Sequence, residues 1–263
     1  MERQQSKPTP PTVQWVPLSR TLALMVRRKK IFGWSFLLIF LTCILTWIGY
    51  LLTVDFMNQL TASLFSPPAE TATVTGWIKQ KGLIAAGWIF HLVSKIFAFY
   101  LAFLVAYTLT TPGYAFLSAA AEKLHAGKHF DPDAEFNLPG VLRDIFEGVK
   151  IAAFGVVVTL AALFVNFIPG IGQALVFILY TYYSALMFVD YPASRRRWSL
   201  AKKLKWLRTH SSPAFRLGVL PALVSMIPFV NVFAMALLFP VLTVHTTLNF
   251  SEIELAKKID QIP

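Results

Sequence analysis

The sequence predicts an all-α integral membrane protein: two long transmembrane helices, two hemi-penetrating (re-entrant) helical hairpins, and amphipathic helices at the membrane surface. Hydrophobic residues make up 56% of the 263 residues and charged residues only 14%, whereas a soluble domain carries about 25% charged residues. Residues 31–54 form an uncharged apolar run long enough to cross a bilayer. In the C-terminal half, two further apolar stretches each contain an Ile-Pro pair, which one continuous straight helix does not accommodate. We expect a single membrane domain.

The N-terminal part of this domain contains the two long helices. Residues 1–19 form a polar tail without the apolar core of a cleaved signal peptide, so we expect residues 31–54 to act as an uncleaved anchor. The second transmembrane helix falls at about residues 87–109, where His91 and Lys95 share one face. A lysine at this depth either lines a pathway or extends toward the headgroups. Cys43 is the only cysteine, which excludes an intrachain disulfide and a cysteine metal cluster.

The placement of the net charge of +11 predicts the orientation. Basic residues are concentrated just before the first long helix and again in residues 190–216. In residues 55–81 the only basic residues are Lys79 and Lys81. This asymmetry follows the positive-inside rule and puts the N-terminus in the cytoplasm of a multi-pass protein. Because membrane attachment already accounts for the charge, we expect no nucleic-acid partner.

The two hairpins are predicted at residues 151–189 and 215–245. The arms of the second are about 12 and 17 residues, roughly 18 and 25 Å at 1.5 Å per residue, and a hydrocarbon core is about 30 Å thick. These short arms favour apices that lie within the membrane. The alternative is that both helix pairs span the membrane and that each proline-containing turn lies outside it. The apex residues either hold helices together or line a pathway, and backbone N–H groups left free there would attract an anion. They are Asn166, Pro169, Gly170, Gly172, Gln173, Pro228 and Asn231.

The basic connection at residues 190–216 predicts an amphipathic helix lying on anionic lipids. Ala201, Leu204 and Leu207 form its apolar side. Lys202, Lys203, Lys205 and Arg208 form the charged arc, with Trp198 and Trp206 at headgroup depth. Further helices are expected at Tyr114–Ala126 and after Pro139, and residues 246–263 are expected to be a tail.

One acidic residue, Asp190, precedes a block of arginines. We expect it to form a structural ion pair with Arg195, Arg196 or a cation of another segment; the alternative is simple turn chemistry. His125 and His129 have the spacing of metal ligands on a helix, but Gly127 between them weakens the helix. We expect no metal, no cofactor and no enzymatic activity, since the sequence contains no nucleophile elbow, phosphate loop or carboxylate pair.

Three motifs in order resemble the CysZ sulfate-permease family, which also includes the eukaryotic etoposide-induced membrane proteins. They are Ile168-Pro169-Gly170-Ile171-Gly172, Asp190-Tyr191-Pro192 and Ile227-Pro228-Phe229-Val230-Asn231, and the resemblance covers about Pro112 to the end. It implies two transmembrane helices plus two hemi-penetrating hairpins, assembled as homo-oligomers in the bacterial inner membrane. It also implies uptake of sulfate or another small oxyanion.

The family's sulfate site implies an anion-binding role for Met25, Val26, Arg27 and Arg28, which stand where the family has a Gly-Leu-Arg-like motif. The arginines are kept and the glycine is lost, which puts sulfate specificity in doubt. The same arginines also fit an ordinary positive-inside cluster. The competing function is a non-transporting membrane scaffold or biogenesis factor, for which Asn166, Gln173 and Asn231 would be packed away from any polar pathway.

Overall fold

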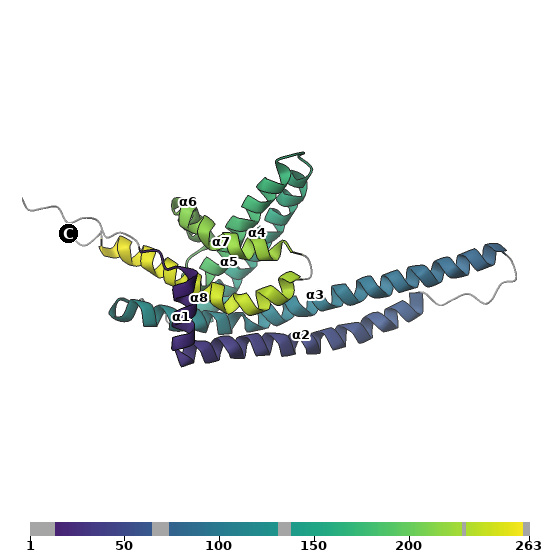
Figure 1. Ribbon diagram of the computed structural model, residues 1–263, viewed down its shortest axis with the longest axis horizontal. Helices are drawn as coiled ribbons and strands as arrows, with labels where there is room; N and C mark the ends of the chain where they lie inside the picture. The colour runs from purple at the N-terminus through teal and green to yellow at the C-terminus, as the bar shows by residue number, and fades with distance from the viewer. Residues whose placement is uncertain (1–13, 65–73, 131–137, 228–229, 260–263) are drawn as a thin grey trace, which may run out of the picture. The chain divides into compact units, whose positions relative to one another are not determined.

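The computed structural model describes residues 14–64, 74–130, 138–227 and 230–259, and within these ranges every regular element is a helix. Five helices contain segments that are long and apolar enough to cross a membrane, which agrees with the predicted all-α membrane fold. The elements in order are α1 Leu18–Arg27, α2 Lys29–Leu64, α3 Val74–Ala126, the 3-10 turn Gly127–His129, α4 Leu138–Asn166, α5 Gly172–Ser194, α6 Leu200–Thr209, α7 Ser211–Ser225 and α8 Val230–Ile259 (Figure 1).

The helices are longer than the sequence indicated. α3 contains both the predicted second transmembrane helix and the predicted helix Tyr114–Ala126, with Pro112 inside it. A membrane helix tolerates such a proline because neighbouring groups satisfy the freed backbone. In the same way, α4 joins the helix expected after Pro139 to the first hairpin arm. The segment predicted as a tail, residues 246–263, is helical up to Ile259, because α8 continues to that residue.

Contacts divide the chain into two compact units, and Leu37–Pro112 forms one of them. Small side chains bring its two helices together: a Cβ placed on Gly49 would lie 3.1 Å from the Ala102 Cβ. Thr42 and Thr110 hydroxyls lie 3.5 Å apart. Close approach at small residues with polar contacts across it is the usual packing of membrane helices.

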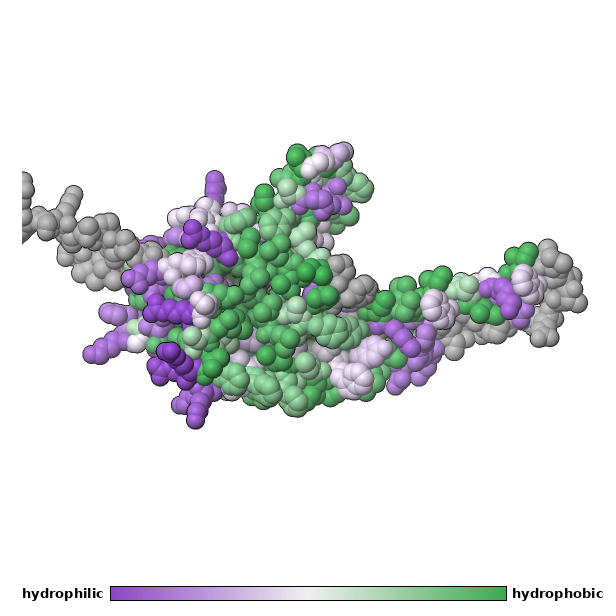
Figure 2. Space-filling view, viewed as in Figure 1, coloured by the Kyte–Doolittle hydropathy of each residue, from purple (hydrophilic) through white to green (hydrophobic). Residues whose placement is uncertain are grey.

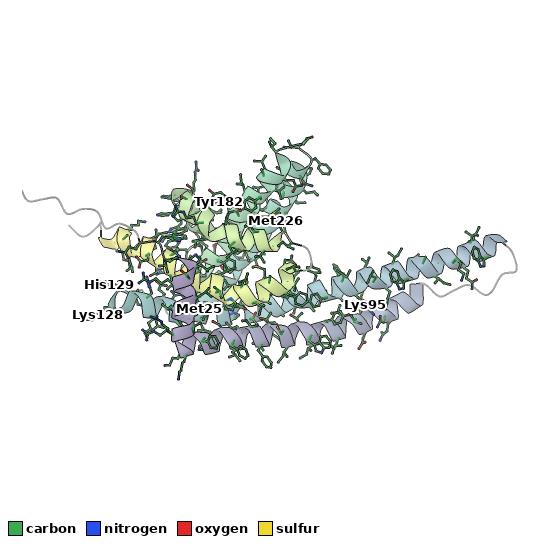
Figure 3. The ribbon with its side chains drawn as sticks, in the orientation of Figure 1. Met25, Lys95, Lys128, His129, Tyr182 and Met226 are labelled. Carbon is green, nitrogen blue, oxygen red and sulfur yellow. The ribbon has the colours of Figure 1, made fainter. Side chains whose placement is uncertain are left out.

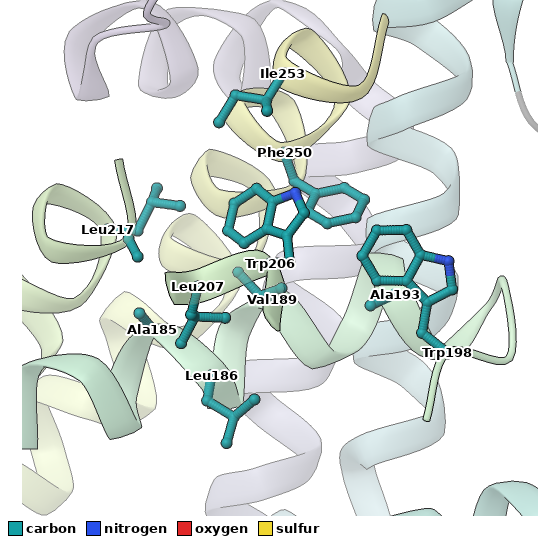
Figure 4. Close-up of a cluster of buried hydrophobic side chains, with 11 residues drawn as sticks. Ala185, Leu186, Val189, Ala193, Trp198, Trp206, Leu207, Leu217, Phe250 and Ile253 are labelled. Atoms are coloured by element: carbon teal, nitrogen blue, oxygen red, sulfur yellow. The ribbon is translucent and has the colours of Figure 1, made fainter. Parts of the chain in front are cut away.

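The other unit comprises Met1–Phe36 and Gly113–Pro263. Its centre is α5, which packs on α4, α7 and α8. A cluster of buried side chains holds α5, α6, α7 and α8 together (Figure 4), with Leu186 and Val189 on α5, Leu217 on α7 and Phe250 on α8. Within this unit, Figure 2 shows a hydrophobic surface over α5 and α7 and hydrophilic side chains near α1 and α6.

The amphipathic pattern predicted for α6 is partly wrong. Its buried face consists of Lys203, Trp206 and Leu207, and Lys203 is completely buried rather than part of the charged arc. Trp198 also belongs to the buried cluster, so neither tryptophan is free to face the headgroups. The reason is that α5, α7 and α8 pack against one side of α6, and this side carries Lys203, Trp206 and Leu207.

The second hairpin consists of α7 and α8. α7 has 15 residues, about 22 Å at 1.5 Å per residue. The arms of the first hairpin are each long and apolar enough to span, as are α2, α3 and α8, while α7 is not among these helices.

Candidate functional site

The predicted anion-binding residues lie at a break between α1 and α2. Arg28 ends α1 with φ −100° and ψ 91°, its N–H donating to the Leu24 carbonyl at 3.0 Å. Its own carbonyl accepts the Phe32 N–H at 3.0 Å, which begins α2. The chain therefore turns at Arg28 with its local hydrogen bonds satisfied and without a proline or glycine.

Contacts with α8 fix the position of α1. The Val16 N–H donates to Asn249 Oδ1 at 2.9 Å, and Asn249 Nδ2 donates to the Val16 carbonyl at 3.1 Å. One turn along α8, His245 Nδ1 lies 3.1 Å from the Thr21 hydroxyl. All of these side chains are buried. The segment that carries the arginines is thus anchored to the second hairpin by buried hydrogen bonds.

Four cations surround the break. Arg27, Arg28, Lys29 and Lys30 are exposed, whereas Met25 of α1 is buried. Figure 3 labels Met25 on α1. The first N–H groups of α2 lie beside these cations, and a helix start attracts negative charge. Met25 lies inside a regular helix, so the local backbone does not require the family's glycine. This arrangement is suited to holding a small oxyanion by charge and by guanidinium hydrogen bonds.

A buried carboxylate lies at the end of the first hairpin. Glu122, near the end of α3, is 1% exposed and forms ion pairs with Arg195 and Arg196. The Arg196 guanidinium also donates to the Pro192 carbonyl at 2.8 Å. A carboxylate buried this deeply needs such cations because an unpaired buried charge is costly. Glu122 was not among the residues predicted from the sequence, although it lies one helical turn after Ser118, which is fully buried.

Asp190 takes a partner from α6. Lys203 Nζ lies 2.5 Å from Asp190 Oδ1, and Ser194 bridges the pair, donating to Asp190 at 2.7 Å and accepting from Lys203 at 2.8 Å. Asp190 therefore pairs with a cation of another segment, one of the predicted alternatives, while Arg195 and Arg196 form ion pairs with Glu122. α5 continues as a helix to Ser194, and residues five and six positions after Asp190 do not share its face. The helical backbone also excludes the turn at Asp190.

The first apex is closed by its own residues. Gln173 Nε2 donates to Asn166 Oδ1 across the turn. Gly170 has φ +81°, which favours glycine, and a Cβ on Gly172 would lie 2.6 Å from the Val165 carbonyl oxygen. The Gly172 N–H, expected to be free, donates to the Ile168 carbonyl at 3.0 Å.

Pro169 lies in the same turn, and its side chain is exposed, as are those of Asn166 and Gln173. At the second apex, Asn231 Nδ2 donates to the Ser225 carbonyl at 3.2 Å. Pro228 lies outside the described residues. The apex amides therefore bond within their own hairpins.

The other histidines considered in the sequence lie on α3 or in the 3-10 turn that follows it. His91 and Lys95 are one turn apart on α3, both half-buried. His125 Nε2 lies 2.6 Å from Glu252 Oε1, which ties the end of α3 to α8.

Comparison with known families identifies the family of the chain. The model of the family described as sulfate transporter CysZ/etoposide-induced protein 2.4 matches residues 18–236, most of the chain. No curated protein sequence matches the chain significantly. The matched range includes the α1–α2 break, the charge pairs at the base of α5 and both hairpin apices. The chain belongs to the sulfate transporter CysZ/etoposide-induced protein 2.4 family.

Proposed function

We propose that this protein is a permease or channel for a small oxyanion, with sulfate as the first substrate to test. The observation that carries the proposal is the α1–α2 break, where Arg27 and Arg28 are exposed beside the start of α2. A guanidinium offers paired N–H donors that match two oxygens of a tetrahedral oxyanion. Membership of a transporter family supports the same function.

The proposal includes a location and an assembly. The concentration of basic residues near α1 and α6 supports a cytoplasmic N-terminus, and we place the protein in a bacterial inner membrane. The limited length of α7 supports a second hairpin that enters the membrane without crossing it. A re-entrant turn needs protein around its backbone, which supports homo-oligomers in which a neighbouring subunit shelters the apices.

Sulfate flux into proteoliposomes containing only this protein tests the function. We expect the Arg27→Ala, Arg28→Ala double variant to lose most of the flux and of the sulfate binding. The control is Lys202→Ala with Lys205→Ala, which removes the same charge from exposed positions on α6. Lys203 is unsuitable because it is buried against Asp190. Equal losses in both double variants would reduce the effect to general surface charge.

The second candidate is a non-transporting membrane scaffold or biogenesis factor. The hydrogen bonds from Gln173 to Asn166 and from Asn231 to the Ser225 carbonyl favour it, because they use the polar apex groups inside turns rather than around a pathway. No sulfate flux above that of protein-free liposomes, from protein that binds no sulfate, would support this candidate and refute the permease.

A further inference from the structure

A cleft of about 380 Å³ lies between the first hairpin and the basic helix α6. Its walls are apolar side chains of α4 and α5, among them Phe154, Val158 and Ile178, and Leu207 of α6 closes it on one side. This volume is in the range of pockets that hold small ligands. An apolar cleft beside membrane helices is suited to a hydrocarbon chain.

The polar groups of the cleft come from the end where α5 approaches α6. α5 runs from the apex at Gly172 toward α6, so Tyr182 lies one turn nearer to α6 than Ile178 does. The Tyr182 hydroxyl donates to the Ser211 carbonyl at 3.4 Å, and Arg208 lines the cleft beside them. Figure 3 shows Tyr182 in this part of the unit. The cleft thus has a cationic end at α6 and an apolar end toward the hairpin apex.

Arg208 is available to a ligand. It is exposed, and within the described parts of the chain it has neither a carboxylate nor an aromatic partner. A second cleft of equal volume, lined by residues of α7 and α8, differs in this respect. Its cation, Arg216, lies over the Trp15 ring at 5.6 Å from the centroid. A free guanidinium at the end of an apolar cleft is complementary to a headgroup phosphate on an acyl chain.

We propose that the cleft between α4, α5 and α6 binds one anionic phospholipid per chain. The phosphate lies at Arg208 and the Ser211 end of α7, and an acyl chain extends along Val158 and Ile178 toward the apex. A free oxyanion does not fit this site as well, because most of the lining is apolar and would remain uncovered. This site is separate from Arg27 and Arg28, so its test does not depend on transport.

The test is a lipid titration of the detergent-purified full-length protein, followed by native mass spectrometry. Phosphatidylglycerol and phosphatidylcholine with identical acyl chains are the two probes. We expect Arg208→Gln to weaken phosphatidylglycerol binding by at least about tenfold, because it removes a charged hydrogen-bond donor. Lys205→Gln is the matched control: it removes an exposed charge from the same helix, outside the cleft. Its effect should stay under about twofold at 0.15 M salt because screening is strong there.

A third variant tests the apolar end. Ile178 is 42% exposed, so Ile178→Trp fills the cleft without entering the core, and it should lower binding of both lipids while leaving the melting temperature unchanged. Equal losses for Arg208→Gln and Lys205→Gln would overturn the site in favour of general surface charge. Equal affinity of the wild-type protein for both lipids, or undiminished binding to Ile178→Trp, would also overturn it.

Discussion

Gly218 permits the close approach of α7 to α5. A Cβ at this position would lie 1.9 Å from the Thr181 carbonyl oxygen, 2.8 Å from its carbonyl carbon and 3.1 Å from the Ala185 nitrogen. All three atoms belong to the backbone of α5, so no rotation of a side chain relieves the overlap. To bring the shortest contact to the ordinary 3.4 Å, the two helices must separate by about 1.5 Å.

We expect Gly218→Ala to destabilise the protein. Overpacking of a core costs up to about 3 kcal/mol, and alanine regains roughly 1 kcal/mol over glycine in a helix. The net loss in free energy of unfolding is then up to about 2 kcal/mol, a shift of up to roughly 30-fold in the folding equilibrium. A separation of this size would also loosen the contacts of Leu186 and Leu217 in the buried cluster.

The assay is unfolding in bicelles by increasing SDS, followed by tryptophan fluorescence. Gly148→Ala is the control: a Cβ there has no neighbour within 4 Å, so this variant should be as stable as the wild type or up to about 1 kcal/mol more stable. The reasoning fails if Gly218→Ala unfolds at the same SDS fraction as the wild type or as Gly148→Ala.

Two further predictions concern the buried ion pair and the depth of the apices. Lys203→Met should cost about 3 kcal/mol by leaving Asp190 unpaired, and adding Asp190→Asn should restore most of the loss, while Lys205→Met at an exposed position should change the stability by less than about 0.5 kcal/mol. Single cysteines at Ile171 and Val230, in a cysteine-free background, should react slowly with a membrane-impermeant maleimide added from either side, because we propose that both apices lie within the membrane.

Each of these measurements has an outcome that contradicts the structure or the proposal. A loss no larger for Lys203→Met than for Lys205→Met would show that the pair has no important role. Rapid labelling of both cysteines from the periplasmic side alone would refute the proposal of re-entrant hairpins and favour pairs of membrane-spanning helices. Ile171 is used because it is exposed, whereas a side chain at Gly172 would overlap the Val165 carbonyl.

The sequence by itself determined the class of the protein and the position of the first hairpin turn. Hydrophobic runs without charge specify membrane helices because the bilayer excludes charge along about 20 residues. The proline at position 169 specifies a break because it removes a backbone donor, and the structure places the first turn there. The uneven distribution of basic residues predicted two basic segments, one before the first long helix and one at residues 190–216. These properties depend on local chemistry and are readable from neighbouring residues.

Only the tertiary structure decided which polar residues meet. Glu122 and Arg195 are 73 positions apart in the chain, and nothing local pairs them. In the sequence, Lys203 resembles the other lysines of α6, yet it is buried because it lies on the side of α6 that packs against other helices, where Asp190 is within reach. The identities of Asn166 and Gln173 in the sequence do not distinguish side chains that line a pathway from side chains that close a turn. A buried charge or amide takes whichever partner the packing brings to it, since leaving it unpaired costs more than the contact gains.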